Sequence, residues 1–261
     1  MKIVIRPDAA SVAELSARLI AQMVTKKPKC VLGLATGRTM EAVYTDLVTR
    51  YRTTGLDFGK CSSFNLDEYI GLAPADSRSY HSYMRTQLFG QVNLDSARTH
   101  VPNGQDPDHV AQGALYEAAI VAAGGIDLQL LGLGETGHIG FNEPLSAFRS
   151  RTRAVTLAPE TRRQNSAMFG GNEDDVPRRA MTMGIATILD ARRILLVVTG
   201  AAKASVLARA IEEPMSAMVS GSALQLHANC VVLADEAAAS RFTKRDYYNW
   251  VIANEPELPD A

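Results

Sequence analysis

The sequence predicts an open α/β fold in which a mostly parallel sheet carries helices on both faces. Short runs of aliphatic and β-branched residues alternate with longer segments of helical periodicity along all 261 residues. This alternation is typical of parallel strands joined by crossover helices, which gives a Rossmann-like three-layer sandwich. A chain of this length can bury a sizeable core, and it contains no internal repeat. We therefore expect residues 1–261 to form a single domain.

Six apolar runs are the candidate strands, and segments of helical spacing lie between them. In residues 11–27, Val12, Leu15, Leu19, Ile20 and Met23 share one stripe, as in an amphipathic helix. The predicted strands are Ile3–Ile5, Val31–Leu34, Ser62–Leu66, Leu128–Leu133, Ile194–Val198 and Val231–Ala234. The other predicted helices are Met40–Tyr51, Tyr80–Phe89, His109–Ala123, Lys203–Ala210 and Thr243–Ala253.

The segment Ala147–Asp175 has a different composition. It is richer in Arg, Asn and Gly, and "FGGNEDDVP" within it is typical of a surface loop. We expect "FGGNEDDVP" to be a mobile loop rather than a linker between domains.

Charge and cysteine content exclude several classes of protein. The net charge of −1 and the pI of about 6.5 provide no basic field for nucleic acid or an anionic membrane. The N-terminus has no apolar core of a signal peptide, and no run is long enough to span a membrane. Cys30, Cys61 and Cys230 lie in or beside apolar runs without C-x-x-C spacing, which indicates reduced thiols. We expect a cytoplasmic protein.

In an open parallel sheet, ligands bind outside the carboxyl ends of the strands, so the residues after each run are the site candidates. The first is "ATGRTM", where Gly37 can expose backbone N–H groups at a helix start and Thr36 and Thr39 add hydroxyls. This favours a phosphate. A strand-to-helix turn with an N-capping threonine explains the same residues, and no Walker A loop is present.

The second candidate is the pair Asp67 and Glu68. Neighbouring residues of a strand point in opposite directions, so one of the two carboxylates is expected to face a pocket. A carboxylate beside a sugar could move a proton between adjacent carbons. A helix cap or a surface pair is the alternative.

The third candidate, "GLGETGHIGFNEP", has the G-x-G-x-x-G spacing of a dinucleotide-binding loop. Pro144 and the polar residues after the glycines interrupt the helix that such a loop needs, and the stretch lies in mid-chain. The competing interpretation is an acid–base site in which Gly134 and Gly137 allow tight turns while His138 and Glu143 face one space. No histidine pair has metal-ligand spacing.

The fourth candidate is Lys203, which follows Gly200 at the start of a predicted helix. A lysine in the first helical turn opposes the helix dipole unless it faces an anion. With Thr36–Thr39 it could close a phosphate site from two sides, although a solvated lysine is the simpler alternative.

Together these stretches resemble the glucosamine-6-phosphate deaminases. The matching motifs are "TGRT" at 36–39, "FNLDEY" at 64–69, "GHIGFNEP" at 137–144, "SRTR" at 150–153, "VP" at 176–177 and "TG" followed by Lys203. They occur in the family's order over nearly the whole chain, and "GHIGFNEP" is highly specific. The wider superfamily includes 6-phosphogluconolactonases and sugar-phosphate-binding domains of repressors, neither of which typically carries "FNEP".

The resemblance implies conversion of D-glucosamine 6-phosphate and water to fructose 6-phosphate and ammonia, with no metal or organic cofactor. It implies that Asp67 moves a proton between C2 and C1, while His138 opens the pyranose ring beside Glu143. The phosphate would lie on Thr36–Thr39 and Lys203. We expect Gly134, Gly137 and Glu68 to line the substrate site as well. A small phosphorylated amino sugar is thus the expected partner, and a homo-oligomer is possible.

The chain departs from the family pattern at three places. Thr136 stands where Asp or Asn is usual, so a hydroxyl would orient the imidazole, and we expect slower ring opening. "ATGRTM" has Arg38 for a glycine and Met40 for a proline, while Ala167 stands where an arginine commonly contacts the phosphate. We expect Arg38 to replace that arginine.

A related departure concerns activation by N-acetylglucosamine 6-phosphate, which some relatives show. Arg153 matches one contact of that effector, but Val155 replaces the usual lysine. We expect no such activation, and a solvated or subunit-facing basic edge at Arg149, Arg151 and Arg153.

Three alternatives to the deaminase remain open. The substrate could be another amino sugar phosphate such as the galactosamine epimer. A 6-phosphogluconolactonase-like hydrolase would need no C2–C1 proton transfer. A non-catalytic sugar-phosphate sensor would usually carry a DNA-binding helix-turn-helix, which we do not find before the first strand.

Overall fold

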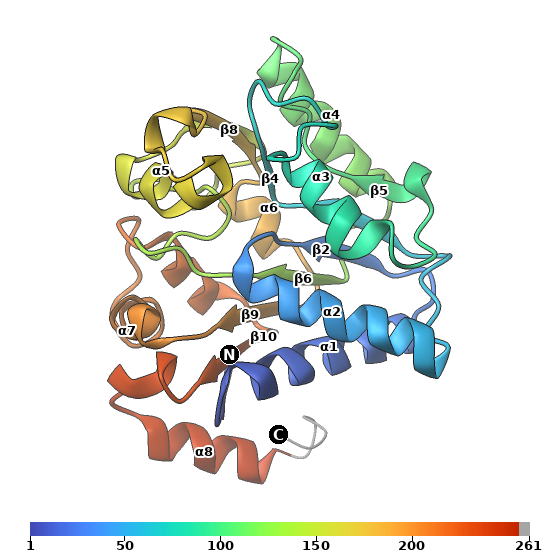
Figure 1. Cartoon of the computed structure of the whole chain (residues 1–261). Helices are drawn as coiled ribbons and strands as arrows, with labels where there is room; N and C mark the ends of the chain where they lie inside the picture. Colours follow the sequence, from blue (N-terminus) through green and yellow to red (C-terminus); the bar gives the residue numbers. More distant parts are fainter. Residues whose placement is uncertain (256–261) are drawn as a thin grey trace.

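The protein is built on a seven-stranded, all-parallel sheet, described here for residues 1–255 of a computed structural model. The strand order is β1-β10-β9-β6-β2-β3-β5 (Figure 1). The strands are β1 (Lys2–Arg6), β2 (Val31–Leu34), β3 (Ser62–Asn65), β5 (Thr99–His100), β6 (Leu128–Leu131), β9 (Ile194–Val198) and β10 (Cys230–Asp235). The predicted fold class and all six predicted strands are confirmed.

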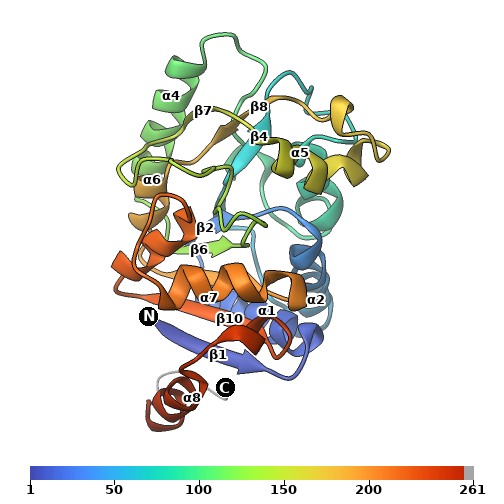
Figure 2. The same ribbon diagram turned by 90° about the vertical axis from the view of Figure 1, so that its left-hand side faces the viewer.

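Helices cover both faces of this sheet. The connections after β1 and β2 run one way across the sheet and those after β5 and β9 run the other way. Right-handed crossovers therefore place α1 and α2 on one face and α4 and α7 on the opposite face (Figures 1 and 2). The bounds are α1 (Ala9–Lys26), α2 (Arg38–Thr54), α3 (Tyr80–Met84), α4 (His109–Ala122), α5 (Pro159–Asn165), α6 (Ile185–Leu189), α7 (Ala204–Glu212) and α8 (Arg245–Asn254).

The helix boundaries follow capping chemistry. Asp8 precedes α1 and accepts a hydrogen bond from the Ser11 N–H at 2.8 Å, and Gly55 ends α2 in the left-handed conformation. The predicted helix from Tyr80 is a short α-helix that continues as a π turn over Arg85–Phe89. Lys203 ends a 3₁₀ turn just before α7 rather than opening the α-helix itself.

A second, antiparallel sheet lies beyond the carboxyl edge of the first. Its order is β4 (Asp67–Tyr69), β8 (Arg179–Thr182) and β7 (Arg153–Thr156), with Asp67 and Arg153 both opposite Thr182. The segment Ala147–Asp175 also contains β7 and α5, neither of which was predicted, whereas the stretch "FGGNEDDVP" within it consists of turns and a short 3₁₀ turn. These strands have only three or four residues and mix polar with apolar side chains, so they lack the apolar run of a buried parallel strand.

A small core of its own supports this second sheet. Tyr69, Phe141 and Phe169 are buried there, with the ring centroids of Tyr69 and Phe141 5.5 Å apart and those of Tyr69 and Phe169 5.3 Å apart. Phe141 belongs to the "GHIGFNEP" loop, so this loop is packed between the two sheets.

The three cysteines are free and buried, as expected. No helix within residues 1–255 is long and apolar enough to cross a membrane.

Candidate active site

The four candidate stretches meet at one edge of the large sheet. They follow β2, β3, β6 and β9, which are consecutive in the order β9-β6-β2-β3, and parallel strands end at the same edge. The chain winds outward in opposite directions from β2 and β6, so this edge includes the topological switch point at which open α/β sheets bind ligands.

The loop after β2 is held from two sides by tyrosine hydroxyls. The Tyr44 hydroxyl donates to the Ala35 carbonyl at 2.5 Å, and the Tyr83 hydroxyl donates to the Gly37 carbonyl at 2.9 Å. Gly37 precedes α2 with φ of 110°, a conformation that L side chains rarely adopt. These contacts fix the loop that contains Thr36 and Thr39 at the start of a helix, as an anion site requires.

Lys203 brings an unpaired cation to the same place. Its Nζ is buried and has no hydrogen-bond partner in the described part of the chain. Burial lowers the pKa of Lys203; Glu135 raises it, and the nearby Arg38 guanidinium lowers it further. A buried ammonium without a partner is costly, so an anionic ligand would stabilise Lys203 here.

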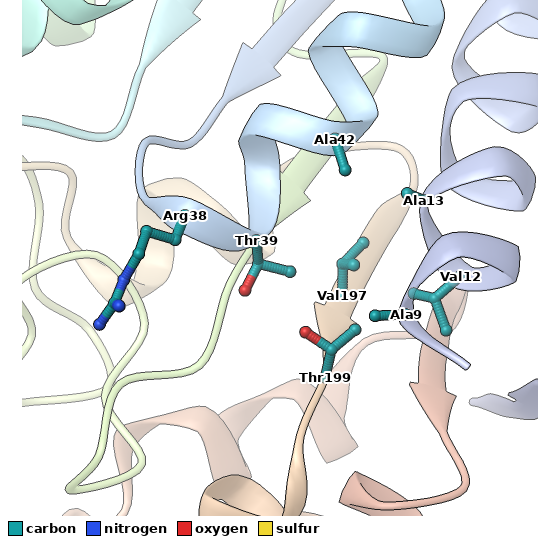
Figure 3. Close-up of a pocket in the computed structure, with 8 residues that line it drawn as sticks. All are labelled: Ala9, Val12, Ala13, Arg38, Thr39, Ala42, Val197 and Thr199. Carbon is teal, nitrogen blue, oxygen red and sulfur yellow. The ribbon is translucent and has the colours of Figure 1, made fainter.

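A cavity of about 290 Å³ adjoins this loop on the α1 side. It is lined by Thr39, Thr199, Arg38 and the small apolar side chains of Ala9, Val12, Ala13, Ala42 and Val197. Figure 3 shows the hydroxyls of Thr39 and Thr199 turned toward the space between them, while the Arg38 side chain points away. Neither the candidate acid–base residues nor Lys203 line this cavity. The cavity therefore lies beside the candidate site and is not the place where the proton transfers would occur.

Asp67 lies where the chain leaves the large sheet and enters the small one. Its side chain is 6 % exposed, and burial, reinforced by Glu68, raises the pKa of Asp67 to about 8. A Cβ on Gly140 would lie 3.5 Å from Oδ2 of Asp67 and 2.9 Å from the Thr182 hydroxyl. The glycine thus lets the loop after β6 approach the carboxylate closely.

The Glu68 side chain, next to Asp67 on β4, accepts hydrogen bonds from backbone N–H groups. Its Oε1 accepts hydrogen bonds from the N–H groups of Tyr69 and Tyr80 at 2.8 and 3.0 Å, and Oε2 accepts one from His81 at 2.9 Å. Burial raises the pKa of Glu68, and these three donors oppose that effect. Contact of Glu68 with a substrate remains a prediction, and its hydrogen bonds favour a supporting role under Asp67.

His138 is 7 % exposed, and its ring lies directly on the backbone of Gly134. A Cβ on Gly134 would lie 2.1 Å from Nε2 of the imidazole, so only glycine fits there. Gly137 has φ of 83° and packs against Val206 and Val219, which turns the chain so that His138 folds back. Both glycines shape the loop, and their contact with a substrate stays a prediction.

Two acceptors surround Nδ1 of His138. The Thr136 Oγ1 lies 2.8 Å away and Oε2 of Glu143 lies 3.4 Å away. With Nδ1 protonated and facing these oxygens, Nε2 is left as the nitrogen that can exchange a proton with a ligand. The Thr136 hydroxyl therefore lies at the ring nitrogen, and its role in orienting the imidazole stays a prediction.

Glu143 is fixed by residues that follow it in the chain. The Ala158 N–H donates to Oε1 at 3.0 Å. Burial alone would raise the pKa of Glu143, but His138, the Thr161 hydroxyl and the Ala158 N–H together hold it below the usual value. Glu143 is thus the carboxylate kept ionised, whereas Asp67 is the one whose proton is retained to high pH.

Two further residues belong to this site and were not predicted. The Tyr80 hydroxyl lies 3.3 Å from that of Tyr69 and beside the Thr36 hydroxyl, and the Thr182 hydroxyl accepts the Phe141 N–H at 3.0 Å. No sequence pattern around Tyr80 or Thr182 could have predicted these contacts. Both depend on how β4, β8 and α3 pack against one another in the fold.

Ala167, the position at which the expected arginine is missing, is exposed in a 3₁₀ turn after α5. Arg153 donates to the Asn142 side chain at 3.0 Å and to Ser146 at 3.2 Å, so its guanidinium is engaged within the chain. Among residues 1–255, no three His, Cys, Asp or Glu side chains form a group that could hold a metal ion.

The open parallel sheet and the groups at its edge are those of an α/β enzyme for small anionic substrates. These groups are a carboxyl with a raised pKa, a carboxylate with a lowered pKa beside a histidine, and a buried lysine without a partner in the described part of the chain. Residues 8–232 match the family of glucosamine-6-phosphate isomerases and 6-phosphogluconolactonases, and the chain belongs to this family.

Within the family the chain is most readily compared with glucosamine-6-phosphate deaminases. It is 48% identical to that of Hahella chejuensis over 96% of this chain and 95% of the relative, and 49% identical to that of Rhodopirellula baltica over 94% and 97%. The solved structure of a monomeric glucosamine-6-phosphate deaminase superimposes with a TM-score of 0.89 at 41% identity, covering 92% of this chain and all of that one. A 6-phosphogluconolactonase from Trypanosoma cruzi, at 18% identity and a TM-score of 0.74, shares the fold.

Proposed function

We propose that this protein is a glucosamine-6-phosphate deaminase, which converts D-glucosamine 6-phosphate and water to fructose 6-phosphate and ammonia. The observation that carries the proposal is the ionised Glu143 beside His138, together with the proton-retaining Asp67 and the unpaired Lys203 on loops at the same edge of the large sheet. Full-length identity near 48% to curated deaminases supports the same activity.

The substrate phosphate binds at the loop of Thr36, Gly37 and Thr39, where it neutralises Lys203. Arg38 is exposed at the first position of α2 and lies close enough to Lys203 to lower the pKa of that lysine. A phosphate between the two cations would relieve their repulsion.

His138 opens the pyranose ring. In the proposed step, Nε2 carries the proton lost from the C1 hydroxyl to the ring oxygen, the C1–O5 bond breaks, and C1 becomes an aldehyde. Thr136 and Glu143 hold Nδ1 protonated during this transfer, which fixes the tautomer.

Asp67 then moves the proton between carbons. Its carboxylate removes the C2 proton and returns it at C1, while one proton passes from the amino nitrogen to O1, so that C2 becomes an imine and C1 an alcohol. Water adds to C2, the C2–N bond breaks, and ammonia leaves with the ketone of fructose 6-phosphate. The step needs an ionised Asp67, so its raised pKa sets the pH at which the free enzyme acts.

The experiment is ammonia release by the purified protein without added metal. Glucosamine 6-phosphate, galactosamine 6-phosphate and 6-phosphogluconolactone are compared, with Asp67→Asn as the control. Turnover of the glucosamine compound supports the proposal. Reaction of only the galactosamine compound changes the substrate, and hydrolysis of only the lactone replaces the activity. Binding without turnover, seen as a rise in melting temperature, indicates a sensor.

We further propose that the enzyme acts in the cytoplasm, since its three thiols are free and buried. A homo-oligomer stays a prediction, which light scattering on the full chain tests.

A further inference from the structure

The first turn of α5 closes around Glu143 from outside the loop that contains it. The Ala158 N–H occupies Oε1, while Oε2 faces Nδ1 of His138 at 3.4 Å. One turn further along α5 is Thr161, which is 1 % exposed. The Thr161 hydroxyl and Oε2 of Glu143 are both buried without another hydrogen-bond partner among residues 1–255.

These two atoms are complementary. A buried hydroxyl almost always donates to an acceptor, and a carboxylate oxygen has free lone pairs and no proton of its own. The Thr161 hydroxyl lies close enough to the Glu143 carboxylate to act on its ionisation.

We propose that Thr161 is a positioning residue, whose hydroxyl donates to Oε2 of Glu143 and holds that carboxylate against Nδ1 of His138. This inference rests on the proposed function only in making His138 and Glu143 the acid–base pair. With one oxygen fixed by Ala158 and the other by Thr161, the carboxylate has a single orientation. A segment 15 or more residues downstream in the chain thus sets the geometry of the histidine.

The other charged groups nearby do not compete for this role. Arg162, next to Thr161 on α5, donates to the carbonyls of Val176 and Glu173, and Glu160 is exposed. On the loop side, Arg153 is bonded to Asn142 rather than to Glu143. His138 is the titratable group that faces the carboxylate.

Thr161→Val tests the proposal, because valine keeps the volume and removes only the donor. The expected kcat falls about tenfold, as for loss of a hydrogen bond to a charged group, while KM stays within about twofold. The titration midpoint of the Glu143 carboxyl, followed by ¹³C NMR and assigned with Glu143→Gln, moves to higher pH. Thr161→Ser restores both quantities.

Thr187→Val is the matched control. Thr187 is also buried and donates to a carboxylate, Glu117 at 2.6 Å, which lies outside the candidate site. This variant is expected to leave both the Glu143 midpoint and kcat unchanged.

An unchanged Glu143 midpoint in Thr161→Val would overturn the proposal, whatever happens to kcat. If Thr161→Val does not fold, Thr161→Ala carries the same test. If the wild type releases no ammonia, the proposed function fails, whereas the titration still decides the role of Thr161.

Discussion

The two halves of the candidate site are built in different ways. The proposed phosphate side consists of loops at the edge of the large sheet, where Thr36 offers a hydroxyl and Arg38 and Lys203 offer cations. The acid–base side lies between the two sheets, where Asp67 and His138 are at most 7 % exposed. Recognition of the anion thus needs accessible groups, whereas proton transfer needs carboxylates whose pKa values are set by their surroundings, by burial for Asp67 and by His138 and hydrogen bonds for Glu143.

The largest effect is expected for Asp67→Asn, which removes the proposed base from the acid–base side. Loss of the base is expected to lower kcat at least about a thousandfold, within the range of general-base contributions. In the wild type, kcat/KM should rise with pH through about 8, as Asp67 ionises. Steady-state ammonia release across pH measures both.

The same variant should stabilise the fold. The folded pKa of about 8 lies above the ordinary 3.8, so the contribution of Asp67 to the free energy of unfolding is fully present below pH 3.8 and lost as pH rises through 8. At pH 9, Asp67→Asn should therefore be more stable by on the order of a few kcal/mol. Asp246→Asn on the exposed face of α8 is the control; equal melting temperatures for both variants and the wild type would contradict the raised pKa.

On the phosphate side, Lys203→Met should act through binding. Loss of a charged hydrogen bond to the phosphate is expected to raise KM about 10- to 100-fold with a smaller change in kcat. Removal of an unpaired buried ammonium should also raise the melting temperature of the free protein. An unaltered KM would place the phosphate elsewhere.

Arg38→Ala should have a milder effect, because the guanidinium is exposed and screened by solvent. We expect KM for glucosamine 6-phosphate to rise several-fold, more steeply at low ionic strength. Arg52→Ala, at the other end of the same helix, should change nothing. If both variants bind substrate like the wild type, Arg38 does not replace the arginine missing at position 167.

The smallest effect is expected for Thr136→Asp. A carboxylate can stabilise an imidazolium at His138 better than the hydroxyl that now lies 2.8 Å from Nδ1. Turnover should rise a few-fold, and Thr136→Val should lower it. A turnover number that stays level or falls in Thr136→Asp would show that the hydroxyl suffices.

Six of the seven strands of the large sheet, and the place of the site, could be predicted because these strands lie in largely apolar runs and ligands gather at their carboxyl ends. The seventh strand, β5, consists of the half-buried Thr99 and His100, has no apolar run and was not predicted. The small sheet could not, because β7 and β8 derive their burial from contacts with each other and with the loop after β6. The roles of Tyr80, Thr161 and Thr182 depend on contacts between distant segments, which no local pattern encodes. Glu68 illustrates the same limit: its partners at Tyr80 and His81 come together only in the fold.

The tyrosine contacts to the loop after β2 have a consequence for the thermodynamics of association. Tyr44 and Tyr83 restrain the Ala35 and Gly37 carbonyls through hydrogen bonds within the chain itself. The loop therefore has little conformational entropy left to lose when an anion arrives, and its backbone N–H groups do not have to be reoriented. Part of the ordering that binding usually requires is completed during folding, so a small phosphate ester can be held without a large interface.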